Sequence, residues 1–335
     1  MSLSRAIFGC SGLRLTAEEK AFFRAVKPYG FILFARNCAA PDQVRALVAD
    51  LHEASGRPTL PILIDQEGGR VARLKPPHWP AYPPAGSLAA LYARDPQAAK
   101  HAVYLNARLM AEDLAALGIT VDCAPLADLP VEGAHDIIGD RAFGRSPQQV
   151  IDLARAMADG LIDSGVVPVL KHIPGHGRAR ADSHEELPVV DSALELLRET
   201  DFVPFKALSD LPMAMTAHVV FTALDPDNMA TTSVRVNDLI RGELGFAGLL
   251  MSDDLSMKAM KGGFAERTNA ALSAGCDVVL HCNGDMAEMT QIAQALLPLE
   301  GMSLLRGERA MARVGARKAF DVEAARDKMR EFMAA

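Results

Sequence analysis

Short apolar runs alternate with longer amphipathic segments along the chain, and this alternation constrains the fold more than any other feature. The runs are apolar at nearly every position, as in strands that are buried on both faces of a parallel sheet. Eight candidate strands follow this pattern, at residues 6–10, 30–36, 60–66, 119–126, 166–172, 213–220, 248–254 and 277–282. Between and after them, helical periodicity predicts helices at residues 16–27, 42–54, 95–117, 147–165, 191–199, 201–209, 235–244, 264–274, 286–297, 303–316 and 321–333.

Local signals mark the ends of several predicted helices. Thr16 and Glu19 have the spacing of a capping box. Ser146 directly before Pro147 predicts an N-cap followed by proline in the first helical turn. Gly118 is placed to end the long helix that precedes it.

The repetition of strand and helix predicts an α/β fold, a (β/α)8 TIM barrel. We expect a single domain over residues 1–335, with extra C-terminal helices after about residue 300. A doubly wound sheet is the alternative fold. It lacks support because no Gly-x-Gly-x-x-Gly motif follows the first predicted strand.

Composition argues against several classes of protein. The net charge is −7, no long basic run occurs and aromatic residues make up only 5%, which disfavours a general nucleic-acid binder. The five cysteines form no Cys-x-x-Cys pair, which disfavours a disulfide framework or a thiolate zinc site. No signal-peptide pattern and no apolar run near 18 residues is present, so we expect a cytoplasmic protein without membrane contact.

Polar residues stand at the C-terminal ends of five predicted strands, where barrel enzymes carry their active sites. Burying such groups is costly unless they are paired or face a polar site. Irregular segments at residues 67–94, 127–146 and 173–190 follow strands three to five and are expected to form the loops of this site. We predict a catalytic site here, with structural ion pairs at the barrel rim as the alternative. The residues concerned are Asp65, Gln66, Glu67, Arg70, Arg73, Lys171, His172, His218, Asp253, Asp254, Cys282 and Asn283.

Residues 171–188 contain His172, His176, His184 and Asp182 and allow three interpretations. These side chains could bind a metal, but the prolines and glycines of the segment oppose the helix that their spacing would need. Alternatively, His184 is an acid–base group that Asp182 orients by accepting a hydrogen bond from one ring nitrogen. The third interpretation is a set of solvated loop histidines.

Asp253 and Asp254 end the seventh predicted strand, where a carboxylate can be a nucleophile, a base or a cap of the next helix. We assign capping to one of the two. No serine-hydrolase or phosphate-loop motif accompanies them.

Four motifs together resemble family 3 glycoside hydrolases of the β-N-acetylglucosaminidase branch. They are DQEGGRVAR at residues 65–73, GDRAFG at 139–144, KHIPGHG followed by DSH over 171–184, and SDDLSM at 252–257. The resemblance runs from about Gly30 to Asn283. Relatives often carry Asp-Thr where this chain has Arg178 and Ala179, but the spacing between Asp182 and His184 is kept.

The resemblance implies a role for each motif residue. Asp253 is the expected nucleophile, and His184, paired with Asp182, is the expected acid/base. The residues expected to hold the sugar are Asp65, Arg73, Arg141, Lys171 and His172.

The resemblance also implies a retaining exo-enzyme of peptidoglycan recycling. It would remove non-reducing N-acetylglucosamine from anhydro-muropeptides, GlcNAc-anhydroMurNAc and its peptides, through a covalent glycosyl-aspartate. No metal, organic cofactor, nucleic acid or membrane partner is implied, and we expect a monomer. Three alternatives remain: a phosphorylase at the same site, since a neutral histidine base repels phosphate less than a carboxylate does; a preference for another sugar, such as glucose; or a catalytically inactive sugar-binding barrel.

Overall fold

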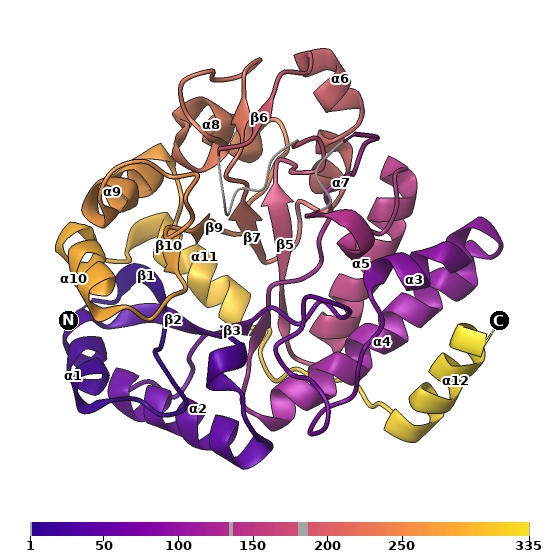
Figure 1. The fold of residues 1–335 in the computed structure, drawn as a ribbon, viewed down its shortest axis with the longest axis horizontal. Coiled ribbons are helices and arrows are strands. Elements are labelled where there is room, and N and C mark those ends of the chain that lie inside the picture. Colours follow the sequence, from indigo (N-terminus) through magenta and orange to yellow (C-terminus); the bar gives the residue numbers. More distant parts are fainter. Residues whose placement is uncertain (1, 134–136, 180–186, 335) are drawn as a thin grey trace.

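Strands from the whole length of the chain close into one parallel barrel in the computed structural model, which describes residues 2–133, 137–179 and 187–334 (Figure 1). Neighbours follow the order β1-β10-β9-β7-β5-β4-β3-β2, and each pair of neighbouring strands is parallel. The barrel strands are β1 (Ser4–Gly9), β2 (Pro28–Leu33), β3 (Ile62–Ile64), β4 (Val121–Asp122), β5 (Val167–Ile173), β7 (Met213–Thr216), β9 (Leu249–Asp254) and β10 (Val278–His281). The predicted TIM barrel is confirmed, and the doubly wound alternative is wrong.

Helices surround this barrel, as Figure 1 shows. The predicted helices are present, with ends shifted by a few residues, and the short α3 lies in a segment that was expected to be irregular. The helices are α1 (Ala17–Val26), α2 (Pro41–Ser55), α3 (Ala85–Ala89), α4 (Pro96–Ala116), α5 (Pro147–Asp163), α6 (Leu194–Glu199), α7 (Phe202–Ala207), α8 (Val234–Gly242), α9 (Phe264–Ala274), α10 (Met286–Ala295), α11 (Gly301–Met311) and α12 (Val322–Ala334). Short 3₁₀ turns are η1 (Ala35–Asn37), η2 (Ala90–Ala93), η3 (Gly139–Arg141) and η4 (Ala230–Thr232).

The predicted helix caps have mixed outcomes. The capping box of α1 is confirmed, since the Thr16 hydroxyl accepts from the Glu19 amide and the Glu19 carboxylate accepts from the Thr16 amide. Gly118 follows the C-cap of α4 with a φ of +79°, where glycine is favoured. Pro147 begins α5 as predicted, but the Ser146 hydroxyl makes no cap bond, so that part of the prediction is wrong.

Side chains alternate between the inside and the outside of the barrel, which produces two cores. Within β1, Ile7 packs in the barrel interior, whereas Ala6 and Phe8 pack under the surrounding helices. Within β2, Ile32 points inward in the same way. Because both faces are covered, these strands carry apolar residues at consecutive positions, which explains the continuous runs in the sequence.

The sixth barrel strand is shorter than predicted. Its prediction covered residues 213–220, but β7 ends at Thr216. The chain then leaves the barrel, and β8 (Val220–Phe221) pairs with β6 (Val189–Val190) in a separate two-stranded sheet. His218 lies on the connection between β7 and β8.

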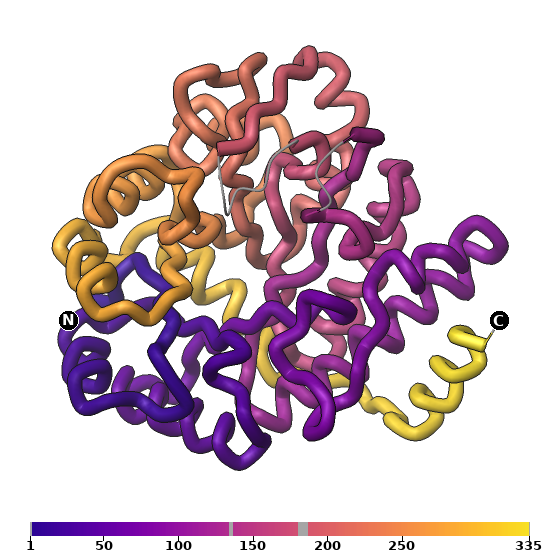
Figure 2. The backbone as a smooth tube through the Cα atoms, viewed as in Figure 1, coloured from indigo at the N-terminus to yellow at the C-terminus, as the bar shows by residue number. Residues whose placement is uncertain are grey.

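The C-terminal helices after residue 300 take two positions. α11 packs against the N-terminal end of the barrel, where Ala310 and Met311 join the interior core. Asp277 ties it there by accepting hydrogen bonds from Ser303 and Arg306. α12 lies apart from α11 and packs on the outside of α4 (Figure 2). The C-terminal end of the barrel remains available for a site.

Candidate active site

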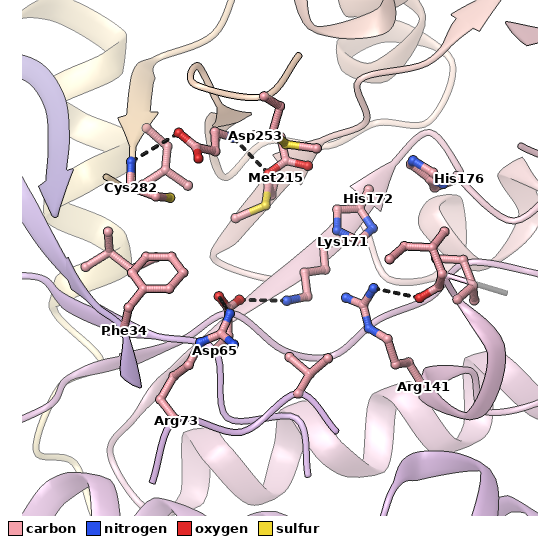
Figure 3. Close-up of a pocket in the computed structure, with 17 residues that line it drawn as sticks. Phe34, Asp65, Arg73, Arg141, Lys171, His172, His176, Met215, Asp253 and Cys282 are labelled. Atoms are coloured by element: carbon pink, nitrogen blue, oxygen red, sulfur yellow. Dashed lines mark hydrogen bonds and ion pairs between the residues drawn. The ribbon is translucent and has the colours of Figure 1, made fainter. Parts of the chain in front are cut away.

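One cavity of about 270 Å³ opens at the C-terminal end of the barrel (Figure 3). Loops after β3, β4 and β5 contribute to its wall, as the sequence predicted. The predicted site residues that line it are Asp65, Arg73, Arg141, Lys171, His172 and Asp253. Asp182 and His184 lie outside the described residues, so the structure leaves their predicted roles untested.

Asp65 is held between two cations at the end of β3. Its Oδ1 lies 2.9 Å from Lys171 Nζ, and its Oδ2 lies 2.8 Å from Arg73 Nη2. Burial by itself raises the pKa of Asp65, but Lys171 and Arg73 outweigh burial and hold that pKa well below its usual range. The carboxylate is therefore ionised, and its position is fixed.

Gln66 folds the loop that brings Arg73 back to Asp65. Its side-chain oxygen accepts hydrogen bonds from the amides of Arg73 and Leu74, and its side-chain nitrogen donates to the Leu74 carbonyl. Gln66 is buried under the loop rather than exposed to the cavity. Its role is thus to position the loop.

Glu67 is a buried residue that the sequence analysis placed at the predicted site without giving it a role. It lies 2.7 Å from Lys171 Nζ and forms a two-pronged ion pair with Arg141, at 2.8 and 2.9 Å. Burial acts to raise the pKa of Glu67, but Lys171 and Arg141 lower it to about 2. A charge count could have indicated this role, because Asp65 alone cannot compensate Lys171, Arg73 and Arg141 in a buried site.

Asp128 is a residue that the sequence analysis missed, and it organises the histidines after β5. This fully buried carboxylate lies 2.7 Å from His172 Nδ1 and accepts from the His176 amide at 2.7 Å. Burial acts to raise the pKa of Asp128, but His172 and His176 lower it. Burial lowers the pKa of His176 itself to about 4, so that ring is neutral near pH 7.

Asp253 and Asp254 end β9 and have different surroundings. The Asp253 carboxylate lines the cavity on the side opposite Asp65 in Figure 3, and its Oδ1 accepts from the Asp254 amide at 2.8 Å. The Asp254 carboxylate instead accepts from the amides of Ser256 and Cys282. Asp254 also lines the cavity, but its hydrogen bonds cap the turn that follows β9.

Of the other polar residues predicted at strand ends, some line the cavity and some do not. Cys282 lines the cavity, whereas Asn283 is exposed and donates to Glu288. His218 is completely buried and does not line the cavity. Apolar walls complete the cavity, and Phe34 lies there with the Arg73 guanidinium 4.8 Å from its ring centre.

No group of three or more potential metal ligands occurs within residues 2–133, 137–179 and 187–334. In the same ranges, no helix is both long and apolar enough to cross a membrane. Each of the five cysteines is free.

A closed parallel barrel with buried, paired charges around one cavity at its C-terminal end is the arrangement of a barrel enzyme. Residues 10–315 match the Glycosyl hydrolase family 3 N terminal domain. The chain therefore belongs to glycosyl hydrolase family 3.

The similarity to individual relatives covers most of the chain. A Beta-hexosaminidase of Alkalilimnicola ehrlichii is 42% identical over 287 residues, which cover 84% of this chain and 82% of that protein. The crystal structure of NagZ from Neisseria gonorrhoeae in complex with N-trifluoroacetyl-D-glucosamine is 31% identical, with a TM-score of 0.85 and coverage of 100% of this chain and 97% of that one. A structure of the same NagZ in complex with zinc ion is 30% identical, with a TM-score of 0.86 and the same coverage.

Proposed function

We propose that this chain is a retaining exo-β-N-acetylglucosaminidase that removes non-reducing N-acetylglucosamine from peptidoglycan fragments. One observation carries the proposal: Asp253 lies across a small cavity from the fixed group of Asp65, Lys171 and Arg73. The similarity to proteins named Beta-hexosaminidase, and to a NagZ that binds a glucosamine derivative, supports the choice of sugar.

The size and charge of the cavity suit one neutral sugar ring. At about 270 Å³ the cavity lies just below the usual range of ligand pockets, which begins at roughly 300 Å³. Asp65 can accept hydrogen bonds from sugar hydroxyls, while Lys171 and Arg73 can donate to sugar oxygens. A pocket that holds one ring favours cleavage of the terminal sugar.

In the first step, a carboxylate oxygen of Asp253 bonds to the anomeric carbon, and the bond from that carbon to the leaving oxygen breaks. His184 gives its proton to the leaving oxygen. In the second step, neutral His184 takes a proton from water, the water oxygen bonds to the anomeric carbon, and the bond to Asp253 breaks. Two inversions retain the β configuration. Asp182 would orient His184 throughout.

Trapping the intermediate tests the nucleophile. An activated fluorosugar analogue of N-acetylglucosamine should label the peptide that contains Asp253, as read by mass spectrometry. Asp253→Ala should lose the label and several orders of magnitude in kcat, because the covalent step has no substitute. Asp254→Asn is the matched control and should keep the label. A label on another residue would refute the assignment.

Comparing substrates with different leaving groups tests the acid/base role of His184. His184→Ala should fail on the natural disaccharide, whose leaving oxygen needs a proton, but should still give a burst with a dinitrophenyl glycoside. Azide needs no base, so it should speed release and yield the β-azide. Asp182→Asn should show the same behaviour more mildly. Equal losses on both substrates, without the azide product, would exclude His184 from this role.

The products test the substrate and the reaction. Incubation with GlcNAc-anhydroMurNAc-peptide and with chitobiose, followed by mass spectrometry, should show faster release of N-acetylglucosamine from the peptidoglycan fragment. Formation of a sugar 1-phosphate in phosphate buffer would indicate the phosphorylase instead. Absence of turnover on both substrates would indicate a barrel that only binds sugar.

A further inference from the structure

His218 is completely buried just behind the end of β9, outside the wall of the cavity. Its Nε2 lies 3.1 Å from the carbonyl oxygen of Asp254, and its Nδ1 lies 2.7 Å from the hydroxyl of Thr231. Thr231 in turn lies 2.8 Å from the hydroxyl of Thr216. Both threonines are also fully buried. The catalytic scheme above uses none of these three residues.

The partners of His218 define which ring nitrogen carries the proton. A carbonyl oxygen can only accept, so Nε2 must donate to Asp254. Burial lowers the pKa of His218, so the ring is neutral near pH 7 and its Nδ1 must accept. The Thr231 hydroxyl, which also lies 3.1 Å from the Ala217 carbonyl, therefore donates its one proton to Nδ1. The Thr216 hydroxyl lies within hydrogen-bond distance of Thr231 and can donate to it. A donating Nε2 and an accepting Nδ1 define the tautomer of the neutral ring.

The His218 side chain bonds β9 just beyond the point where the backbone pairing between β7 and β9 ends. Strands β7 and β9 pair from Met213 and Leu249 up to Met215 and Met251, where the pairing ends. On the other side of β9, Asp254 remains tied to β10, because it pairs with Leu280 and accepts from the Cys282 amide. On the β7 side, the hydrogen bond from His218 to Asp254 replaces the missing backbone pairing.

We propose that His218 is a positioning residue that fixes the Asp254–Leu255 peptide through the Asp254 carbonyl. Because the Asp254 amide in turn donates to Asp253 Oδ1, this restraint aims the Asp253 carboxylate at the anomeric carbon. Thr231 and Thr216 hold the histidine in the donating tautomer. The inference rests on the proposed role of Asp253 as nucleophile. An error of about 1 Å in the position of a reacting group can cost about 100-fold in rate, so the effect should fall on kcat.

Two isosteric variants separate the hydrogen bond from the bulk of the ring. His218→Gln places an amide nitrogen near the position of Nε2 and should keep the bond to Asp254. His218→Asn offers its amide only at the position of Nδ1 and should lose that bond. We expect kcat, and the rate of fluorosugar labelling, to fall about 100-fold in His218→Asn and to recover most of this loss in His218→Gln. The inhibition constant for N-acetylglucosamine should stay unchanged in both.

Substituting Thr231 provides a second, smaller perturbation of the hydrogen bonds of His218. Thr231→Val removes the hydroxyl that donates to Nδ1 while keeping the side-chain shape, whereas Thr231→Ser keeps the hydroxyl. The valine variant should lower kcat, and the serine variant should restore it. This result would show that kcat depends on the Thr231 hydroxyl and not on the packing of the side chain.

His281→Asn is the control for the loss of a buried histidine hydrogen bond. His281 is equally buried, but its Nε2 bonds Glu288, 2.7 Å away and outside the cavity. The control should lower the melting temperature and leave kcat unchanged below that temperature. Equal kcat in His218→Gln and His218→Asn, or a loss that appears in the inhibition constant, would overturn the inference about His218. Labelling of a residue other than Asp253 in the wild-type enzyme would instead overturn the proposed function.

Discussion

Replacing Glu67 by glutamine tests whether the buried charges of the cavity are mutually dependent. Glu67 is 6% exposed and compensates both Lys171 and Arg141. Its pKa falls from an ordinary 4.5 to about 2 in the folded protein. At about 1.4 kcal/mol for each pH unit, the fall corresponds to about 3 kcal/mol of extra stability for the folded state with ionised Glu67. Glu67→Gln removes that contribution.

The pH dependence of this stabilisation follows from the direction of the shift. A lowered pKa stabilises the fold fully above the unfolded-state value near 4.5, and the contribution is lost as the pH falls toward 2. Urea unfolding should therefore show wild type about 3 kcal/mol more stable than Glu67→Gln at pH 7. The difference should narrow steadily when the same titration is repeated below pH 4.5.

A surface ion pair of the same geometry supplies the control. Glu243 binds Arg198 through two contacts of 2.8 Å, but both side chains are exposed to solvent. Glu243→Gln should hardly change the unfolding free energy, because water screens exposed pairs. A Glu67→Gln difference that is the same at pH 3 and pH 7, or no larger than that of Glu243→Gln, would refute the reasoning.

Three further outcomes are expected. Lys171→Ala should lower kcat and raise KM together in steady-state assays, because contacts to sugar hydroxyls tighten in the transition state; a change in melting temperature alone would contradict this. Asp277→Ala should cost about 3–5 kcal/mol in urea unfolding, because it leaves Arg241 and Arg306 without their buried carboxylate; kcat should be unchanged, and a selective loss of kcat would speak against a purely structural role. Activity should survive EDTA, and a loss that added Zn²⁺ restores would revive the histidine segment as a metal site.

Much of the fold can be predicted from sequence because the barrel strands are buried on both faces. Continuous apolar runs mark all of them, and helical periodicity marks the elements between. Asp65, Lys171 and Asp253 could be assigned to one site because parallel strands place their C-terminal ends at the same end of a barrel. The motifs identified the family that the profile match then confirmed.

Which charged side chains pair with one another at the site could be decided only by the tertiary structure. Glu67 stands two residues from Asp65 in the sequence, yet its role depends on Arg141, 74 positions away. Asp128 likewise acquires its role from His172, 44 positions away. The short length of β7 and the position of His218 also depend on contacts with β9 that no local pattern encodes. Periodicity and motifs indicate whether each element is buried and what kind of residue it carries. The partner of a buried charge depends on the closing of the barrel, because only then do residues far apart in the sequence come within hydrogen-bond distance.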